Sequence, residues 1–406
     1  MQKRVLFVDD EPMVLDGLRR ALHGMRQEWD MRFVSSAAAA LEALGGDTFD
    51  AIVTDMRMPG TDGAQLLEQV KDMHPEVVRI VLSGQSDKGA LLRSIAPAHQ
   101  FLAKPCDLKE LRDRLTQAFT TRDLLCNPKL ATIVSRLRSV PSLPVLFYEL
   151  TSALKNESTS LAQIEQIVSK DVGMAAKILQ LANSAFIGAH GQVSSIRQAL
   201  CLIGAEIIRS LTLTIHVFSH FDGNPFITAH LPALWNHSLS VASLAQRIAI
   251  AETGRKSMGE ESFTSGLLHD VGKIVLLAEM PDEYHQVVEN ISAGKASFHD
   301  LEMEYVGCTH EEIGAYLMAI WGLPPSTIQA VNFHNCPASI PHNRFSPLTA
   351  VHCADAIASA NDLSFLNHDI DIDLNYLKEL SLAEKLSLWK EFQDQNPPSF
   401  EAPGGF

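Results

Sequence analysis

The sequence predicts an α/β domain built on a doubly wound, five-stranded parallel sheet, followed by an all-α helical domain. Three observations lead to this prediction. Within residues 1–122, short apolar segments alternate with helix-length segments, as in buried parallel strands joined by helical crossovers. From about residue 123 the strand signals stop, and apolar residues recur at helical spacing. The chain has 406 residues, which is enough for two or more domains.

The first part predicts five strands and five helices in strict alternation. Strands are expected at residues 4–8, 31–35, 50–54, 78–82 and 99–102. Helices are expected at about 13–25, 37–44, 63–72, 88–95 and 107–121. Asp107 is the expected N-cap of the last helix, and Pro59 and Gly60 mark a tight loop after the third strand.

The second part predicts helices throughout. Residues 123–135 are expected to link the two parts, 136–336 to form the helical domain, and 337–406 to form a helical extension with a frayed end. Ser194 and Ser195 precede an apolar periodic segment as an N-cap, and Pro324 and Pro325 begin a later helix. A last helix is expected between Leu380 and Phe392.

The composition indicates which binding partners and which cellular compartment to expect. The formal net charge is −15, and most of it lies beyond residue 122, which disfavours nucleic acid as a partner of the second part. No apolar segment is long enough to cross a bilayer, and the first residues do not form a signal peptide. Six cysteines without CxxC spacing indicate reduced thiols. We therefore expect a cytoplasmic protein without a membrane partner.

Five polar residues stand at the ends of the predicted strands: Asp9, Asp10, Asp55, Ser83 and Lys104. In an open α/β sheet the functional crevice lies beyond the carboxyl ends of the strands, so these side chains should converge. Clustered carboxylates favour a hard divalent cation such as Mg²⁺. A carboxylate beside Mg²⁺ can accept a phosphoryl group, which a lysine and a hydroxyl would then hold.

These residues lie in the motifs VDDEP, VTDMRMPGTDG, VLSGQ and LAKP, and over residues 1–122 the chain resembles the receiver domain of two-component response regulators. The resemblance implies a flavodoxin-like fold and a sensor histidine kinase as partner. It implies that Asp55 is the phosphoacceptor and that Mg²⁺ is bound by Asp9, Asp10, Asp55 and the backbone carbonyl of Arg57. It further implies that Ser83 and Lys104 hold the phosphoryl group and that Phe101 is the aromatic switch residue.

The second part contains a series of potential metal ligands, namely His237, His269, Asp270, His310, His334 and Asp355. Imidazoles and carboxylates suit Fe, Mn or Zn, and a metal-bound water can attack a phosphate ester. His237, the adjacent His269 and Asp270, and the distant Asp355 resemble the pattern of HD-type phosphohydrolases. Alternatively, His269 and Asp270 form a satisfied internal pair, with Lys273 one turn further on as a salt-bridge partner, and His310 and His334 are hydrogen-bonded core residues.

The wider second part resembles the HDOD domain, a mostly non-catalytic relative of the HD superfamily. The resemblance depends on VPSLPVLFYELTSAL, VSKDVGMAAKILQLANSAFIG, VSSIRQALCLIGAEIIRSL, LWNHSLSVASLAQRIA and FTSGLLHDVGKIVLL. The HHE segment and GYP triplet of the HD-GYP cyclic di-GMP phosphodiesterases have no counterpart in NFHNCPASIP. The resemblance implies an all-α signalling module, although the full ligand set puts its non-catalytic character in doubt.

Together the two parts predict a cytoplasmic, phosphorylation-controlled response regulator in a phosphorelay. Its helical module is expected to bind a downstream signalling protein or to support a homodimer. The alternative is a metal-dependent phosphohydrolase acting on a nucleotide or a cyclic dinucleotide, gated by phosphorylation of Asp55.

Overall fold

The computed structural model describes most of the chain. The described residues are 2–84, 98–104, 144–155, 159–183, 192–204, 225–294, 296–360 and 371–394, with residue 208 and single positions or short stretches between 109 and 134. The predicted helix at 88–95, the predicted N-cap Asp107 and most of the predicted linker at 123–135 lie outside the described residues.

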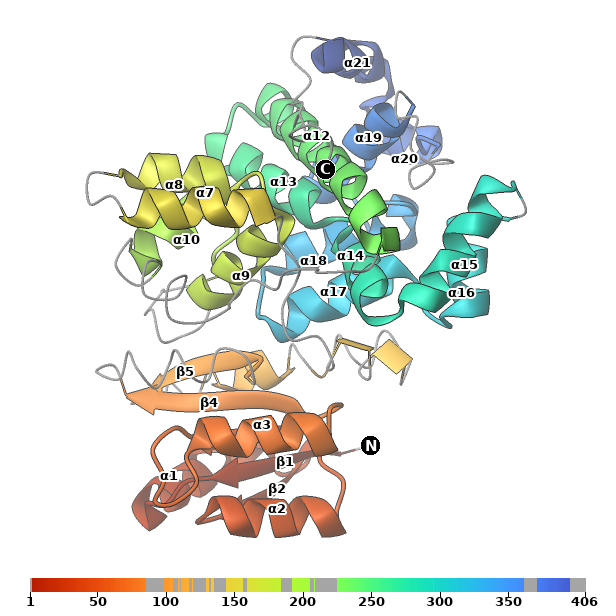
Figure 1. Ribbon diagram of the computed structural model, residues 1–406. Coiled ribbons are helices and arrows are strands. Elements are labelled where there is room, and N and C mark those ends of the chain that lie inside the picture. The colour runs from red at the N-terminus through yellow and green to blue at the C-terminus, as the bar shows by residue number, and fades with distance from the viewer. Residues whose placement is uncertain are drawn as a thin grey trace.

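The first part is a five-stranded parallel sheet with the order β2-β1-β3-β4-β5 (Figure 1). Its strands are β1 (Lys3–Val8), β2 (Trp29–Val34), β3 (Ala51–Asp55), β4 (Val78–Gly84) and β5 (Gln100–Lys104). The register pairs the last residue of β3, Asp55, with Leu82, and Gly84 with Lys104. The polar ends of these strands therefore meet at one edge of the sheet.

Helices cover both faces of this sheet. On one face, Leu6 and Ile52 share a buried apolar cluster with α2 (Ala37–Gly46) and α3 (Gly63–Met73). On the other face, Phe7 and Val53 pack with α1 (Pro12–Ala21) and with helical residues 111–116. Alternate residues of each strand thus enter opposite cores, as the doubly wound prediction requires.

The second part consists of packed helices above the β4–β5 edge of the sheet (Figure 1). Its helices are α7 (Pro144–Lys155), α8 (Leu161–Val168), α9 (Val172–Ala182), α10 (Ile196–Ile203), α12 (Pro225–Thr253), α13 (Lys256–Leu268), α14 (Val271–Glu279), α15 (Pro281–Ser292), α16 (Phe298–Tyr305), α17 (His310–Ile320), α18 (Pro325–Phe333), α19 (Pro347–Ser359), α20 (Leu374–Glu379) and α21 (Leu386–Asp394). The predicted fold class, a parallel α/β sheet followed by a mostly helical part, is confirmed. None of the described helices has both the length and the apolar character of a membrane span.

Several predicted helix ends are correct and others are wrong. Ser195 caps α10 by accepting a hydrogen bond from Gln198 N, and α18 begins at Pro325 as predicted. The first helix, predicted to residue 25, ends at Ala21 and continues as a 3₁₀ turn over His23–Met25. Gly24, a weak helix former, lies in this turn.

The predicted helix between Leu380 and Phe392 begins only at Leu386. Ser381 adopts a left-handed conformation with φ of 60°. Its N–H and that of Leu382 bond to the last carbonyls of α20, which terminates that helix. The predicted range therefore covers a 3₁₀ turn (Ala383–Lys385) and most of α21 rather than one continuous helix.

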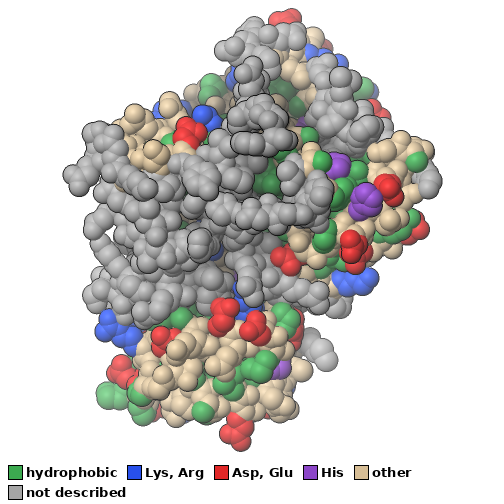
Figure 2. Space-filling view, viewed as in Figure 1, with side chains coloured by type: hydrophobic (Ala, Val, Ile, Leu, Met, Phe, Trp, Pro, Cys, Tyr) green, Lys and Arg blue, Asp and Glu red, His purple; other side chains and the backbone are tan. Residues whose placement is uncertain are grey.

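Charged side chains are interspersed over the described part of the face drawn in Figure 2. Acidic groups stand out on both the sheet-containing part and the helical part. This agrees with the acidic composition of the chain.

Candidate functional site

The carboxyl ends of three strands bring the first predicted residues together. Asp9 directly follows β1, Asp55 ends β3 and Lys104 ends β5. Lys104 Nζ lies 2.7 Å from Asp9 Oδ2 and also contacts Asp55. Both carboxylates are buried, so two acidic groups and one ammonium share a site with little solvent.

The remaining residues of this first site are close in the chain or in the register. Asp10 follows Asp9 and is partly buried. Arg57 lies in the loop after β3, and its N–H donates to Asp55 Oδ2 at 2.9 Å. Ser83 stands next to Leu82, the register partner of Asp55, and Phe101 is the second residue of β5. The side chains of Ser83 and Phe101 lie outside the described residues.

Burial and charge oppose each other at Asp55. The pKa of the Asp55 carboxyl is raised, chiefly by burial and also by the charge of Asp9, while the hydrogen bond and charge of Lys104 oppose the rise. For Lys104, burial alone would lower the ammonium pKa, but the hydrogen bonds and charges of Asp55 and Asp9 together outweigh this effect and raise it. A second cation would relieve the repulsion between the two carboxylates.

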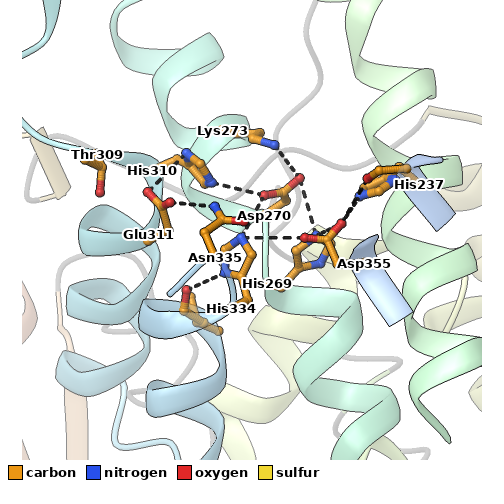
Figure 3. Close-up of polar contacts among 12 residues, drawn as sticks. His237, His269, Asp270, Lys273, Thr309, His310, Glu311, His334, Asn335 and Asp355 are labelled. Atoms are coloured by element: carbon orange, nitrogen blue, oxygen red, sulfur yellow. Dashed lines mark hydrogen bonds and ion pairs between the residues drawn. The ribbon is translucent and has the colours of Figure 1, made fainter. Parts of the chain in front are cut away.

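The helical part brings together all six predicted ligands (Figure 3). They are His237 on α12, His269 and Asp270 between α13 and α14, His310 at the start of α17, His334 at the end of α18, and Asp355 on α19. Each of these side chains is at most 3% exposed. His237 Nε2 lies 2.9 Å from Asp355 Oδ1, and His310 Nε2 lies 3.4 Å from Asp270 Oδ1. We call this group the histidine centre.

Outer hydrogen bonds orient three of the imidazoles. His269 Nδ1 bonds the Gly266 carbonyl at 2.7 Å, and His334 Nδ1 bonds the Val331 carbonyl at 2.9 Å. His310 Nδ1 lies 2.8 Å from Glu302 Oε2. Because carbonyl and carboxylate oxygens only accept, each Nδ1 carries the proton, and in the neutral ring each Nε2 lone pair points into the centre.

The inward-facing atoms lie near one another but make no hydrogen bonds. The buried atoms without a hydrogen bond include His269 Nε2, His310 Nε2, His334 Nε2, Asp270 Oδ1, Asp355 Oδ2 and Glu311 Oε2. Buried polar atoms are rarely left unsatisfied, and here six of them face one another. Three groups of three ligand atoms each lie within 4.8 Å of one another, which is a spacing that metal ions can bridge. The residues therefore fit the metal that an HD-type pattern implies.

The charge of the histidine centre also favours a bound metal cation. Four carboxylates, those of Asp270, Glu302, Glu311 and Asp355, are buried in the centre together with the ammonium of Lys273. Burial lowers the pKa of His269 to about 4, so this imidazole is neutral and available as a ligand. His310 differs, because Glu302 and Glu311 outweigh burial and raise its pKa to about 9. A metal cation would replace that proton and offset the remaining negative charge.

The structure adds residues that sequence reasoning missed. Glu311 lies 3.3 Å from His310 Nδ1, and its Oε1 accepts a hydrogen bond from Asn335 at 2.7 Å. The adjacent His-Glu pair in THEE was an available signal for Glu311. Glu302, eight residues before His310, carries no such signal, because it enters the centre only through the packing of α16.

The predicted alternative, a pair between Asp270 and Lys273, is also present. Lys273 Nζ donates to Asp270 Oδ2 at 2.8 Å. This bond satisfies only one oxygen of Asp270, and the other oxygen makes no hydrogen bond. The ionic pair is therefore present, but it leaves other inward-facing atoms of the centre without a hydrogen bond.

Family comparisons match both parts of the chain. The response regulator receiver domain matches residues 5–116, and the HDOD domain matches residues 140–337. An uncharacterised protein of Treponema pallidum is 27% identical over 54% of this chain and 42% of its own length. The hydrogenase transcriptional regulatory protein HoxA of Cupriavidus necator is 37% identical over 30% of this chain and 25% of its own length.

The chain thus matches less than half the length of these two relatives. Among solved structures, the MmoQ response regulator of Methylococcus capsulatus is similar at 23% identity and a TM-score of 0.48, covering 62% of this chain and 98% of that one. The two family matches follow one another in the order predicted from the motifs. Residues 5–116 belong to the receiver domain family and residues 140–337 to the HDOD family, so the chain is a receiver–HDOD response regulator.

Proposed function

We propose that this response regulator accepts a phosphoryl group on Asp55 from a sensor histidine kinase and signals through its HDOD domain. The observation that carries the proposal is the convergence of Asp9, Asp55 and Lys104 at the carboxyl edge of the sheet. Asp9, Asp10, Asp55 and the Arg57 carbonyl would hold Mg²⁺. When bound, Mg²⁺ would neutralise the carboxylates and the incoming phosphoryl oxygens.

The chain's own residues have defined parts in this reaction. An Asp55 carboxylate oxygen attacks the phosphorus, and the bond from phosphorus to the donor breaks. Lys104, already beside Asp55, supplies a positive charge to the new phosphoryl oxygens, and the Ser83 hydroxyl donates a hydrogen bond. Phe101 would follow the displacement of Ser83 as the switch residue. The change in receiver state is a population shift between two conformations.

A labelling experiment tests the phosphoacceptor. Wild-type protein incubated with Mg²⁺ and acetyl phosphate should gain one phosphoryl group, measured by intact-protein mass spectrometry. Asp55→Asn should gain none, because the amide is not a nucleophile of this kind. Asp50→Asn is a matched control, since Asp50 lies before β3 and bonds Arg4 N at 2.7 Å, away from the site. Labelling retained in Asp55→Asn would move the acceptor elsewhere.

We propose that the HDOD domain is a non-catalytic output module that binds a downstream signalling protein or a second copy of the chain. The support is the closure of the histidine centre, whose nine residues (the six ligands with Lys273, Glu302 and Glu311) are each 8% exposed or less. Closed sites are typical of structural metals, whereas catalytic sites keep an open position. Fe, Mn or Zn bound there would fix the helices that present the partner surface. The proposed location is the cytoplasm.

A second candidate function is a metal-dependent phosphohydrolase gated by Asp55. The unsatisfied donor atoms that favour a metal also favour this candidate, because the same metals activate water. Protein purified without a His tag should contain stoichiometric metal in either case. Hydrolysis of cyclic dinucleotides or nucleotides by the wild type, lost in a folded Asp270→Ala variant, would establish the enzyme. Metal without turnover would support the output module.

A further inference from the structure

The receiver donates hydrogen bonds to the C-terminal end of helix α17. This helix finishes with a turn in which Gly322 has a φ of 75° and Leu323 N bonds the Met318 carbonyl. Gln100 Nε2, from β5 of the receiver, donates to the Ile320 carbonyl at 2.8 Å. Carbonyls at a helix end need such donors, and here another domain provides one of them.

A receiver arginine makes the second contact at the same point. Arg114 donates to the Gly322 carbonyl at 2.9 Å and is buried. A cation is favourable here because the C-terminal end of a helix carries partial negative charge. The fit is tight, since a Cβ on Gly322 would lie 2.2 Å from a guanidinium nitrogen of Arg114. We call Gln100 and Arg114 the receiver cap of α17.

The opposite end of α17 belongs to the histidine centre. His310 and Glu311 are its first two residues, and both face the centre. A Cβ on Gly272 would lie only 1.9 Å from the His310 carbonyl oxygen, so the HD segment packs directly on the start of this helix. Over 11 residues the helix spans about 16 Å. It therefore joins the receiver cap to the histidine centre as one continuous element.

Strand β5 extends this connection to the phosphorylation site. Gln100 is its first residue and Lys104, which contacts Asp9 and Asp55, is its last. Additional contacts tie the same edge to the helical part: Gln180 Nε2 on α9 donates to the His99 carbonyl at 3.3 Å. His99 Nε2 in turn lies 2.7 Å from a guanidinium nitrogen of Arg79. The two sites are thus linked by a strand and a helix in tandem.

We propose that phosphorylation of Asp55 weakens metal binding at the histidine centre by withdrawing the receiver cap from α17. When Lys104 turns to the phosphoryl oxygens, β5 shifts and Gln100 and Arg114 release the helix end. The helix then holds His310 and Glu311 less firmly. Coupling between two sites is reciprocal, so metal in the centre also disfavours the phosphorylated receiver. This inference rests on the metal centre proposed above.

The test measures zinc affinity of the full-length protein in two receiver states. Zn²⁺ is the probe, its affinity is read by competition with a chromophoric chelator, and saturating Mg²⁺ occupies the receiver. Beryllofluoride mimics the phosphoryl group, and its binding is followed by fluorine NMR. We expect beryllofluoride to lower the zinc affinity about five-fold or more. An unchanged or increased affinity with beryllofluoride bound overturns the inference.

Variants of the receiver cap test whether the coupling between the two sites passes through α17. The double variant Gln100→Met and Arg114→Met should have reduced zinc affinity and no further response to beryllofluoride. Gly322→Ala should behave in the same way, because its methyl group displaces Arg114. Gly254→Ala is the matched control, since Gly254 has a φ of 66° and open space around it. It should retain the wild-type response.

The outcomes separate this inference from the proposed function. A response to beryllofluoride that persists in both cap variants, with zinc stoichiometry unchanged, overturns the route through α17. A wild type that binds no zinc overturns the metal centre, and the inference falls with it. A wild type that binds zinc but no beryllofluoride overturns the receiver proposal and, with it, the coupling.

Discussion

Replacing Lys273 with methionine tests the electrostatic description of the histidine centre. Lys273 Nζ lies 2.8 Å from Asp270 Oδ2, and both side chains are buried. Methionine keeps the length of the side chain and removes its charge. Removing one partner of a buried ion pair costs about 3–5 kcal/mol, because the remaining charge stays desolvated. We expect metal-free Lys273→Met to lose this much free energy of unfolding near neutral pH.

An exposed pair in the same domain is the control. Lys256 Nζ lies 4.0 Å from Glu260 one turn along α13, and the Lys256 side chain is 75% exposed. Exposed pairs of this kind contribute less than about 0.5 kcal/mol, so Lys256→Met should be nearly neutral. Urea unfolding of both variants in the presence of a chelator measures the difference, and added Zn²⁺ should recover part of the loss in Lys273→Met.

The loss of stability in Lys273→Met should become smaller as the pH falls. Against the raising effect of burial, Lys273 is the main group that holds the pKa of Asp270 well below its usual value. In the variant that pKa rises, so the penalty is present near neutral pH and is relieved as the pH falls through the new folded-state value. Lys273→Met should therefore approach the wild type on acidification. A loss no larger than that of Lys256→Met, or one that grows towards low pH, would refute the reasoning.

Three further outcomes are expected. Gly63→Ala would place a Cβ 2.2 Å from the Asp55 carbonyl oxygen. The end of β3 must then move, which should slow labelling of Asp55 by acetyl phosphate about a hundredfold. Gly45→Ala is the control, because a Cβ there meets open space and labelling should be normal. Gly272→Ala would place a Cβ 1.9 Å from the His310 carbonyl oxygen. This variant should lose zinc binding, and its free energy of unfolding in urea should fall by about 1–3 kcal/mol. Zinc at a hundred times its dissociation constant should stabilise the wild type by about 2.7 kcal/mol, and a chelator should reverse this.

The phosphorylation site was predictable because parallel strands share one direction. Each of Asp9, Asp55 and Lys104 closes an apolar strand in the sequence, and the carboxyl ends of such strands meet at one edge. The roles of Ser83 and Phe101 stay predictions, since their side chains lie outside the described residues. Among the described residues of the first part, the errors lie at the ends of elements, where local propensity and capping compete.

The histidine centre was predictable only in part. His269 and Asp270 are adjacent in the chain, and the more distant ligands were suggested by a known pattern. Glu302 and Glu311 were missed, although both contact His310. No local period distinguishes a glutamate that faces a buried centre from one that faces solvent. The packing of α16 against α17 makes that distinction.

By itself the sequence determined the two-part architecture, the identity of the strand-end residues and the histidine series, because these depend on local periodicity and on residue type. Only the tertiary structure decided that the receiver caps α17. The bonds from Gln100 to Ile320 and from Arg114 to Gly322 join residues 220 and 208 positions apart. Their existence depends on how the receiver and the helical part pack together, and a pattern confined to one segment carries no information about that geometry.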